Sequence, residues 1–125
     1  MKRVLVIEDQ KPVRDAIGEL LKAADLEPKL IGDGAAALEE LRGKAYDLVT
    51  LDLNMPSLDG VSIMEALSAD KGPNAKTPVI VISAYLTRDI ENDLRELGVG
   101  HFLGKPFDAD DLISAVSSLT EKDAK

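Results

Sequence analysis

Residues 3–9 read Arg-Val-Leu-Val-Ile-Glu-Asp, an apolar run that ends directly in two acids. A second run, Val79-Ile80-Val81-Ile82, is also continuously apolar and is followed by Ser83. Unbroken apolar runs of this length are typical of strands that are covered on both faces, as in a parallel sheet. The two stretches therefore predict two strands of a buried parallel sheet.

Further β-rich runs bring the expected strands to five: Arg3–Ile7, Pro28–Ile31, Leu48–Leu51, Val79–Ser83 and Gly100–Leu103. Between and after these strands, apolar residues recur at helical spacing, as Leu112, Val116 and Leu119 do in a last helix over Asp108–Thr120. Alternating strands and helices of this kind predict an open α/β sheet, parallel throughout, with helices on both faces.

Some element ends can be located as well. Asp33 and Asp59 stand just before the second and third helical patterns, where N-cap residues are expected. Gly98 follows the fourth pattern, where a left-handed C-cap residue is expected. The segment Lys71–Thr77 reads Lys-Gly-Pro-Asn-Ala-Lys-Thr and is expected to be an exposed loop within one domain.

Composition and charge exclude several classes of function. The chain has 125 residues, which fits a single domain over residues 1–125, and its net charge is −8. Nucleic acids and anionic membranes both attract basic surfaces, so this charge argues against either partner. The chain has no Cys and one His, which argues against Cys-ligated and multi-His metal sites. Its apolar runs are too short for a signal peptide or a membrane span, so a cytoplasmic location is expected.

Chemically versatile residues gather where the strands are expected to end. Glu8 and Asp9 follow the first strand, and Asp52 follows the third. Ser83 ends the fourth strand, and Lys105 lies just past the fifth. Open parallel sheets bind ligands at the carboxyl ends of their strands, where the strand order reverses. In a 2-1-3-4-5 order the first and third strands are neighbours, so the three carboxylates are expected to converge on one crevice.

Three converging carboxylates need a compensating charge. Two like charges 4 Å apart repel by about 4 kcal/mol at an effective dielectric constant near 20, and one Lys neutralises only one of them. An acid-rich site made only of oxygen ligands suits Mg²⁺. Together with a Lys ammonium and a hydroxyl, Mg²⁺ would hold a phosphoryl group, and an Asp carboxylate can be the nucleophile that accepts it. The alternative is that each acid is a solvated loop residue or a helix cap.

Four segments in order resemble the receiver domain of two-component response regulators, and the likeness covers essentially the whole chain. They are Ile7-Glu8-Asp9, Leu51-Asp52-Leu53-Asn54-Met55-Pro56 with Asp59-Gly60 after it, Ile82-Ser83-Ala84, and Phe102-Leu103-Gly104-Lys105-Pro106-Phe107. The resemblance implies a flavodoxin-like (βα)5 three-layer sandwich with a five-stranded parallel sheet of order 2-1-3-4-5. It also implies phosphorylation by a sensor histidine kinase or a histidine phosphotransfer protein.

The resemblance assigns roles to the acids of the crevice. Asp52 would be the phosphoacceptor. Asp9 and Asp52 would ligate Mg²⁺ directly, the backbone carbonyl of Asn54 would be a third ligand, and Glu8 would act mainly through water. Lys105 would pair with Asp52 and then with the phosphoryl oxygens.

The resemblance also implies a switch. Ser83 would bond the phosphoryl group on activation, and Phe102 would turn inward behind it. The Lys105–Pro106 bond would be cis. Two residues depart modestly from the family pattern: Ser83 stands where Thr is more frequent but keeps the hydroxyl, and Glu8 stands where Asp is frequent.

Three other functions compete with this interpretation. An FMN carrier of the flavodoxin type would need a Ser-, Thr- or Gly-rich phosphate loop after the first strand, where this chain has acids. A phosphatase with an Asp nucleophile, of the haloacid dehalogenase type, would need a general acid two residues after Asp52, where Asn54 stands. A receiver-like module that is never phosphorylated usually lacks one of the acids or the Lys, and here all are present.

We expect a stand-alone regulator, either a chemotaxis-type switch or a phosphorelay shuttle, with the excised receiver of a longer protein as the alternative. It would promote only its own phosphorylation and dephosphorylation and would not be an enzyme acting on other molecules. Its output is expected to reach a protein target through the fourth helix, fifth strand and fifth helix. Because Asp108–Thr120 contains three Asp and no Lys or Arg, a charge-paired dimer through this face is not expected, and the chain is expected to be a monomer.

Overall fold

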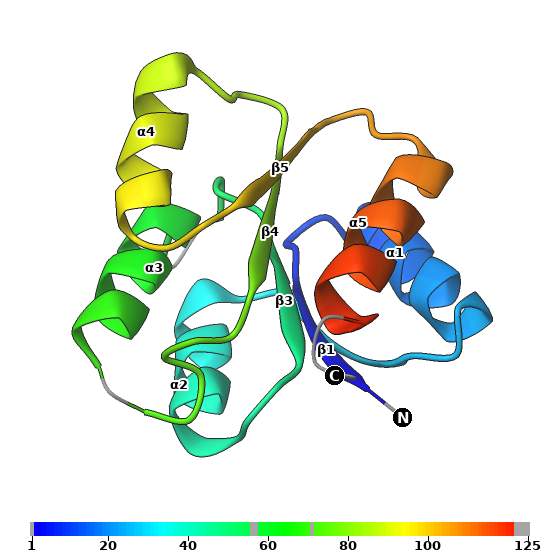
Figure 1. The fold of residues 1–125 in the computed structure, drawn as a ribbon, viewed down its shortest axis with the longest axis horizontal. Coiled ribbons are helices and arrows are strands. Elements are labelled where there is room, and N and C mark those ends of the chain that lie inside the picture. The colour runs from blue at the N-terminus through cyan, green and yellow to red at the C-terminus, as the bar shows by residue number, and fades with distance from the viewer. Residues whose placement is uncertain (1, 56–57, 71, 122–125) are drawn as a thin grey trace.

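Strands and helices alternate along the chain in the computed structural model, which describes residues 2–55, 58–70 and 72–121 (Figure 1). The strands are β1 (Arg3–Ile7), β2 (Glu27–Ile31), β3 (Leu48–Leu51), β4 (Val79–Ser83) and β5 (His101–Gly104). The helices are α1 (Lys11–Ala23), α2 (Gly34–Gly43), α3 (Gly60–Ala69), α4 (Arg88–Glu96) and α5 (Ala109–Glu121). Three strands have the predicted bounds, β2 begins one residue earlier, and β5 lies one residue later. Pro56 of the motif lies outside the described residues.

The five strands form one parallel sheet in the order β2-β1-β3-β4-β5, as the resemblance implies. Helices α1 and α5 cover one face of this sheet, and α2, α3 and α4 cover the other (Figure 1). Alternate residues of β1 therefore enter different cores: Leu5 and Ile7 pack on the side of α2, and Val4 and Val6 on the side of α1. All four are at most 1% exposed. Burial on both faces explains why the run is continuously apolar.

Helix ends follow the predicted caps. The side chains of Asp33 and Asp59 each accept a hydrogen bond at 2.8 Å from a backbone N–H three residues later, at the starts of α2 and α3. Gly98 follows α4 with φ +104°, a left-handed conformation that favours glycine. No helix in the described part of the chain has both the length and the apolar character that crossing a membrane requires.

The loop predicted over Lys71–Thr77, described from residue 72 on, is exposed at most positions as expected, but one of its side chains is buried. Asn74 is 4% exposed. Its Nδ2 donates to the carbonyl oxygens of Leu41 and Lys44 at 2.6 Å each, and its Oδ1 accepts from the Tyr46 N–H at 2.8 Å. These carbonyls lie at the end of α2, where the helix supplies no donors. Asn74 therefore anchors this loop, whose composition alone suggests a solvated turn.

Thr50 yields a prediction about stability. It lies in β3 between Val6 of β1 and Ile80 of β4, and its hydroxyl is buried with no hydrogen-bond partner among the described residues. Such a hydroxyl costs about 1–3 kcal/mol. We expect Thr50→Val, which keeps the shape, to raise the free energy of unfolding by about 1 kcal/mol in equilibrium urea denaturation.

Thr77→Val is the matched control, because the Thr77 hydroxyl hydrogen-bonds Asn74 Oδ1 at 3.0 Å. That variant should lose stability. A Thr50→Val protein that is destabilised as much as Thr77→Val would contradict the assignment of an unpaired hydroxyl.

Candidate functional site

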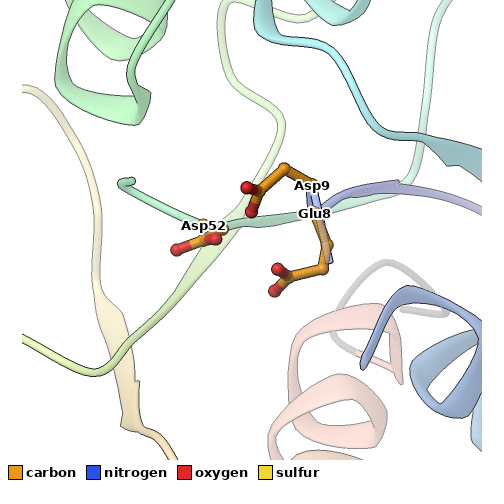
Figure 2. Close-up of side chains that lie close together, drawn as sticks. All are labelled: Glu8, Asp9 and Asp52. Carbon is orange, nitrogen blue, oxygen red and sulfur yellow. The ribbon is translucent and has the colours of Figure 1, made fainter. Parts of the chain in front are cut away.

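The three acids meet at the carboxyl ends of β1 and β3. One carboxylate oxygen from each of Glu8, Asp9 and Asp52 lies within 4.8 Å of the others. Figure 2 shows the three side chains lying close together. The sheet register causes this proximity, because Ile7 pairs with Leu51 and the Asp52 N–H donates to the Ile7 carbonyl at 2.9 Å. The structure thus has the convergence that the sequence predicts.

A cavity of about 330 Å³ opens at these strand ends. It is lined by Asp9, Gln10, Asp52, Asn54, Ala84, Tyr85 and Lys105. Asp52 reaches it although only 4% of the residue is exposed, whereas Glu8, 1% exposed, is not among the described residues that line it. Asp9 and Asp52 can therefore contact a small ligand in this cavity directly, whereas Glu8 does not line it.

Lys105 is a cation that contacts two of the three acids, Glu8 and Asp52. Its Nζ lies 2.8 Å from Glu8 Oε1, an ion pair rather than an aligned hydrogen bond, and 3.4 Å from Asp52 Oδ2. The Lys105–Pro106 peptide bond that follows is cis, the isomer that the resemblance implies. One ammonium thus partly offsets the repulsion between the two buried carboxylates.

Burial and charge shift the pKa values of this pair. Burial raises the pKa of Glu8 above 4.5, and so does the charge of Asp52, although contact with Lys105 opposes both. Since the folded chain holds this proton more tightly than the unfolded chain, ionisation of Glu8 costs stability as the pH rises past 4.5. Burial alone would lower the pKa of Lys105, but contact with Glu8 and the charge of Asp52 raise it overall. Lys105 therefore remains an ammonium at neutral pH.

Ser83 does not lie on the rim of the crevice, where the sequence predicts it. The residue is fully buried at the end of β4, and among the described residues the cavity is lined by its neighbours Ala84 and Tyr85 instead. Its Oγ accepts a hydrogen bond from the Tyr85 N–H at 3.2 Å, and its carbonyl accepts from the Lys105 N–H at 2.9 Å. The hydroxyl is thus buried beside residues that border the cavity, and its oxygen already accepts a hydrogen bond.

Phe102 is half-buried in β5 and packs against the core that contains Leu5 and Ile7. The guanidinium carbon of Arg95, on α4, lies 4.8 Å from the centre of its ring. A carboxylate oxygen of Glu91 lies 3.6 Å from Arg95 Nη2. A cation–π contact at a surface contributes about 0.5–1 kcal/mol. The sequence predicts a role for Phe102 but does not predict that the Arg95 guanidinium stacks over its ring.

Three residues make contacts around the acids that the sequence does not predict. The Gln10 N–H donates to Glu8 Oε2 at 3.2 Å, and the Asn54 N–H donates to Asp52 Oδ1 at 3.2 Å. Arg14, one turn into α1, contacts the backbone of the loop that carries Glu8 and Asp9. An Arg at this helix position is compatible with a solvated surface, so the sequence contains no signal for that contact.

A second, mainly apolar cavity of about 550 Å³ adjoins the site. It lies between α1 and the loop after β5, where Pro12, Val13, Ala16 and Phe107 line it, and it shares Lys105 with the first cavity. The acids are therefore bordered by an apolar surface.

Comparisons with known sequences agree with this fold and site. The family model for the response regulator receiver domain matches residues 4–117. The sensory transduction protein RegX3 of Mycolicibacterium smegmatis is 32% identical, with 99% of this chain and 53% of that protein covered. The transcriptional regulatory protein DltR of Streptococcus agalactiae is 34% identical, with 96% and 52% covered. The chain spans about half the length of these curated relatives.

Solved structures give the same result. The Francisella response regulator 1452 receiver domain has a TM-score of 0.88 and 30% identity, and the match covers 98% of each chain. The receiver domain of the Pseudomonas aeruginosa sensor histidine kinase PA1611 has a TM-score of 0.85 and 26% identity, with 96% of this chain and 98% of that chain covered. That structure holds a magnesium ion in its active-site cleft.

The crowding of acids predicts how charge removal and Mg²⁺ affect stability. In chelator, Asp9→Asn should raise the melting temperature by several degrees, because relieving about 1 kcal/mol shifts a domain of this size by roughly 4 °C. Millimolar Mg²⁺ should raise the melting temperature of the parent by mass action, and should do so much less in Asp9→Asn. Differential scanning calorimetry measures both effects.

Asp93→Asn is the control, since it removes the same charge from an exposed position on α4. It should change neither the melting temperature in chelator nor the response to Mg²⁺. If the two variants behave alike, net charge rather than the cluster determines stability.

Proposed function

The chain belongs to the family of response regulator receiver domains, and we propose that it accepts a phosphoryl group on Asp52 from a phosphohistidine. The observation that carries this proposal is the meeting of three carboxylates within 4.8 Å, with the Lys105 ammonium 3.4 Å from Asp52. Of these acids, Asp52 is the one that is buried, lines the cavity and contacts Lys105.

The transfer step needs little covalent chemistry from the chain. An Asp52 carboxylate oxygen forms a bond to phosphorus while the bond from phosphorus to the donor imidazole nitrogen breaks, and that nitrogen leaves with the electron pair. Catalysis of such a transfer consists mainly of positioning and charge neutralisation. The Lys105 ammonium, already beside Asp52, would pair with a phosphoryl oxygen.

The donor set fits Mg²⁺, since carboxylate and carbonyl oxygens are the ligands this ion prefers. Asp9, Asp52 and the backbone carbonyl of Asn54 would hold it, and Glu8 would act through water, in keeping with its place outside the cavity. Bound there, the ion would supply positive charge to the phosphoryl oxygens. The chain would act on no other substrate, promoting only its own phosphorylation and dephosphorylation.

Ser83 and Phe102 are the residues that would respond to the phosphoryl group. The Ser83 Oγ accepts a hydrogen bond from the Tyr85 N–H, so its own proton would be the donor to a phosphoryl oxygen. Such a contact would require Ser83 to move toward the cavity. Phe102 pairs with Val81 in the strand that Ser83 ends. It would turn inward behind Ser83 and leave its contact with Arg95.

The phosphodonor would be a sensor histidine kinase or a histidine phosphotransfer protein. The apolar cavity between α1 and the loop after β5 supports this partner, because it adjoins the acids and shares Lys105 with their cavity. A helix carrying the phosphohistidine could rest on Pro12, Val13 and Phe107 while its imidazole reaches Asp52. Docking at this surface would place the donor beside the acceptor.

Phosphorylation of Asp52 is tested by intact-protein mass spectrometry after incubation with acetyl phosphate. We expect one phosphoryl adduct in the parent with Mg²⁺, and none in Asp52→Asn or in excess chelator. Asp93→Asn, which removes an exposed acid, should retain the adduct. An adduct that survives in Asp52→Asn, or that forms equally well in chelator, would refute the assignment.

Output would pass to a protein target through the face made by α4, β5 and α5, and we propose that the chain remains a monomer. Helix α5 presents Asp110 and Asp111 at its exposed start, and its sequence contains no Lys or Arg. On α4, Arg95 is already engaged by Phe102 and Glu91. Two such faces would oppose acids with few free bases, and like charges across an interface cost several kcal/mol.

Sedimentation velocity with Mg²⁺ and beryllofluoride, a phosphoryl mimic, tests the assembly. The expected species is a monomer of 13.4 kDa at both low and high salt. A tight, salt-sensitive dimer that Arg95→Glu abolishes would show that this face pairs with itself.

A further inference from the structure

Arg14 of α1 contacts the backbone of the acidic loop. Its Nη1 donates to the Glu8 carbonyl at 2.9 Å and to the Asp9 carbonyl at 3.3 Å. The residue is half-buried. These two consecutive carbonyls belong to the residues that carry two of the three clustered carboxylates. One guanidinium thus fixes the backbone from which both side chains project.

Gly32, in the loop after β2, makes room for this contact. A Cβ at position 32 would lie 2.3 Å from Arg14 Nη1 and 3.1 Å from its Cζ. The guanidinium therefore occupies the space where any other residue would have its side chain. The clash involves the far end of a flexible side chain, and the backbone atom nearest to such a Cβ, the Glu8 carbonyl oxygen, would lie 3.5 Å away. Ala at this position would therefore displace the guanidinium without colliding with that backbone atom.

The neighbouring cations have other partners. Lys105 contacts the carboxylates of Glu8 and Asp52. Lys11, in the first turn of α1, pairs with Asp15 at 2.6 Å and is exposed. Among the described residues, Arg14 is thus the cation whose side chain hydrogen-bonds the main chain of this loop.

We propose that Arg14 is a positioning residue for the divalent cation. Gly32, which has no side chain, leaves the space that the Arg14 guanidinium occupies. The inference rests on the proposed function, in which Asp9 and Asp52 ligate Mg²⁺. Groups that orient metal ligands typically affect metal affinity by 10- to 100-fold when they are removed. Arg is suited to this place because its planar guanidinium stays charged and presents several donors on a long side chain.

The test measures binding of the metal alone, using the electron paramagnetic resonance signal of free Mn²⁺ and competition by Mg²⁺. We expect Arg14→Met, which keeps bulk but removes the donors, to weaken Mn²⁺ binding about 10-fold. Gly32→Ala should weaken binding comparably while Arg14 itself is intact. Arg14→Lys should recover part of the affinity, because one ammonium can still reach a carbonyl.

Lys11→Met is the matched control, since it removes one positive charge from the same helix without a contact to the acidic loop. It should leave the affinity within about twofold of the parent. Equal weakening in Lys11→Met and Arg14→Met would overturn the proposal, because net charge would then account for the loss. Unchanged affinity in both Arg14→Met and Gly32→Ala would also overturn it.

Two further measurements separate this inference from the proposed function. Urea denaturation confirms that each variant is folded under the binding conditions, and a variant that is folded but binds weakly supports the positioning role. The acetyl phosphate assay on the parent reports on Asp52 independently. A parent that binds Mn²⁺ through Asp9 but never becomes phosphorylated would refute the proposed function alone. A phosphorylated parent with unaffected Arg14→Met and Gly32→Ala variants would refute the inference alone.

Discussion

The structure depends on the pairing of β1 with β3. This pairing holds together acids, Glu8, Asp9 and Asp52, that would otherwise separate because their charges repel. The register of Ile7 with Leu51 places the residues after both strands side by side. Two carboxylates about 4 Å apart repel by roughly 4 kcal/mol at an effective dielectric constant of 20. Burial of each large apolar side chain contributes about 1.5–3 kcal/mol, and four consecutive residues of β1 are almost completely buried. The core therefore outweighs the repulsion, and the acids remain together.

Sequence predicted the sheet well where strands are buried on both sides and less well at its edges. The bounds of β1, β3 and β4 were correct because each has a strand on either side, so its apolar run begins and ends with the ladder. The edge strands β2 and β5 each pair on one side only. Each edge strand includes one residue that composition assigns to a loop. In β2 this residue is Glu27, which pairs with Arg3, and in β5 it is Gly104, which pairs with Ser83. Register decided these positions, and local composition contains little information about register.

The sequence likewise predicts some features of the candidate site and not others. The positions of Glu8, Asp9, Asp52 and Lys105 follow from strand ends, which are a property of the chain itself. The contacts that organise the site depend on distant segments meeting. Arg14 needs the loop at Gly32, and Asn74 needs the end of α2, 33 residues away at Leu41. Ser83 ends β4 as the sequence predicts, but it is fully buried and is not among the described residues that line the cavity. Composition contains no signal for how deeply a hydroxyl at a strand end is buried.

Lys105 connects the acids after β1 and β3 with the end of β4. Lys105 Nζ contacts Glu8 and Asp52, while its backbone N–H donates to the Ser83 carbonyl. In the proposed function, a phosphoryl group on Asp52 would add negative charge and would draw the ammonium away from Glu8, which is 1% exposed and would lose its partner. The cost of leaving that carboxylate unpaired would oppose the movement, and the attraction of the new charge would favour it. Because the Lys105 N–H donates to the Ser83 carbonyl at the end of β4, a shift of Lys105 would act directly on the strand that carries Ser83 and lies beside Phe102.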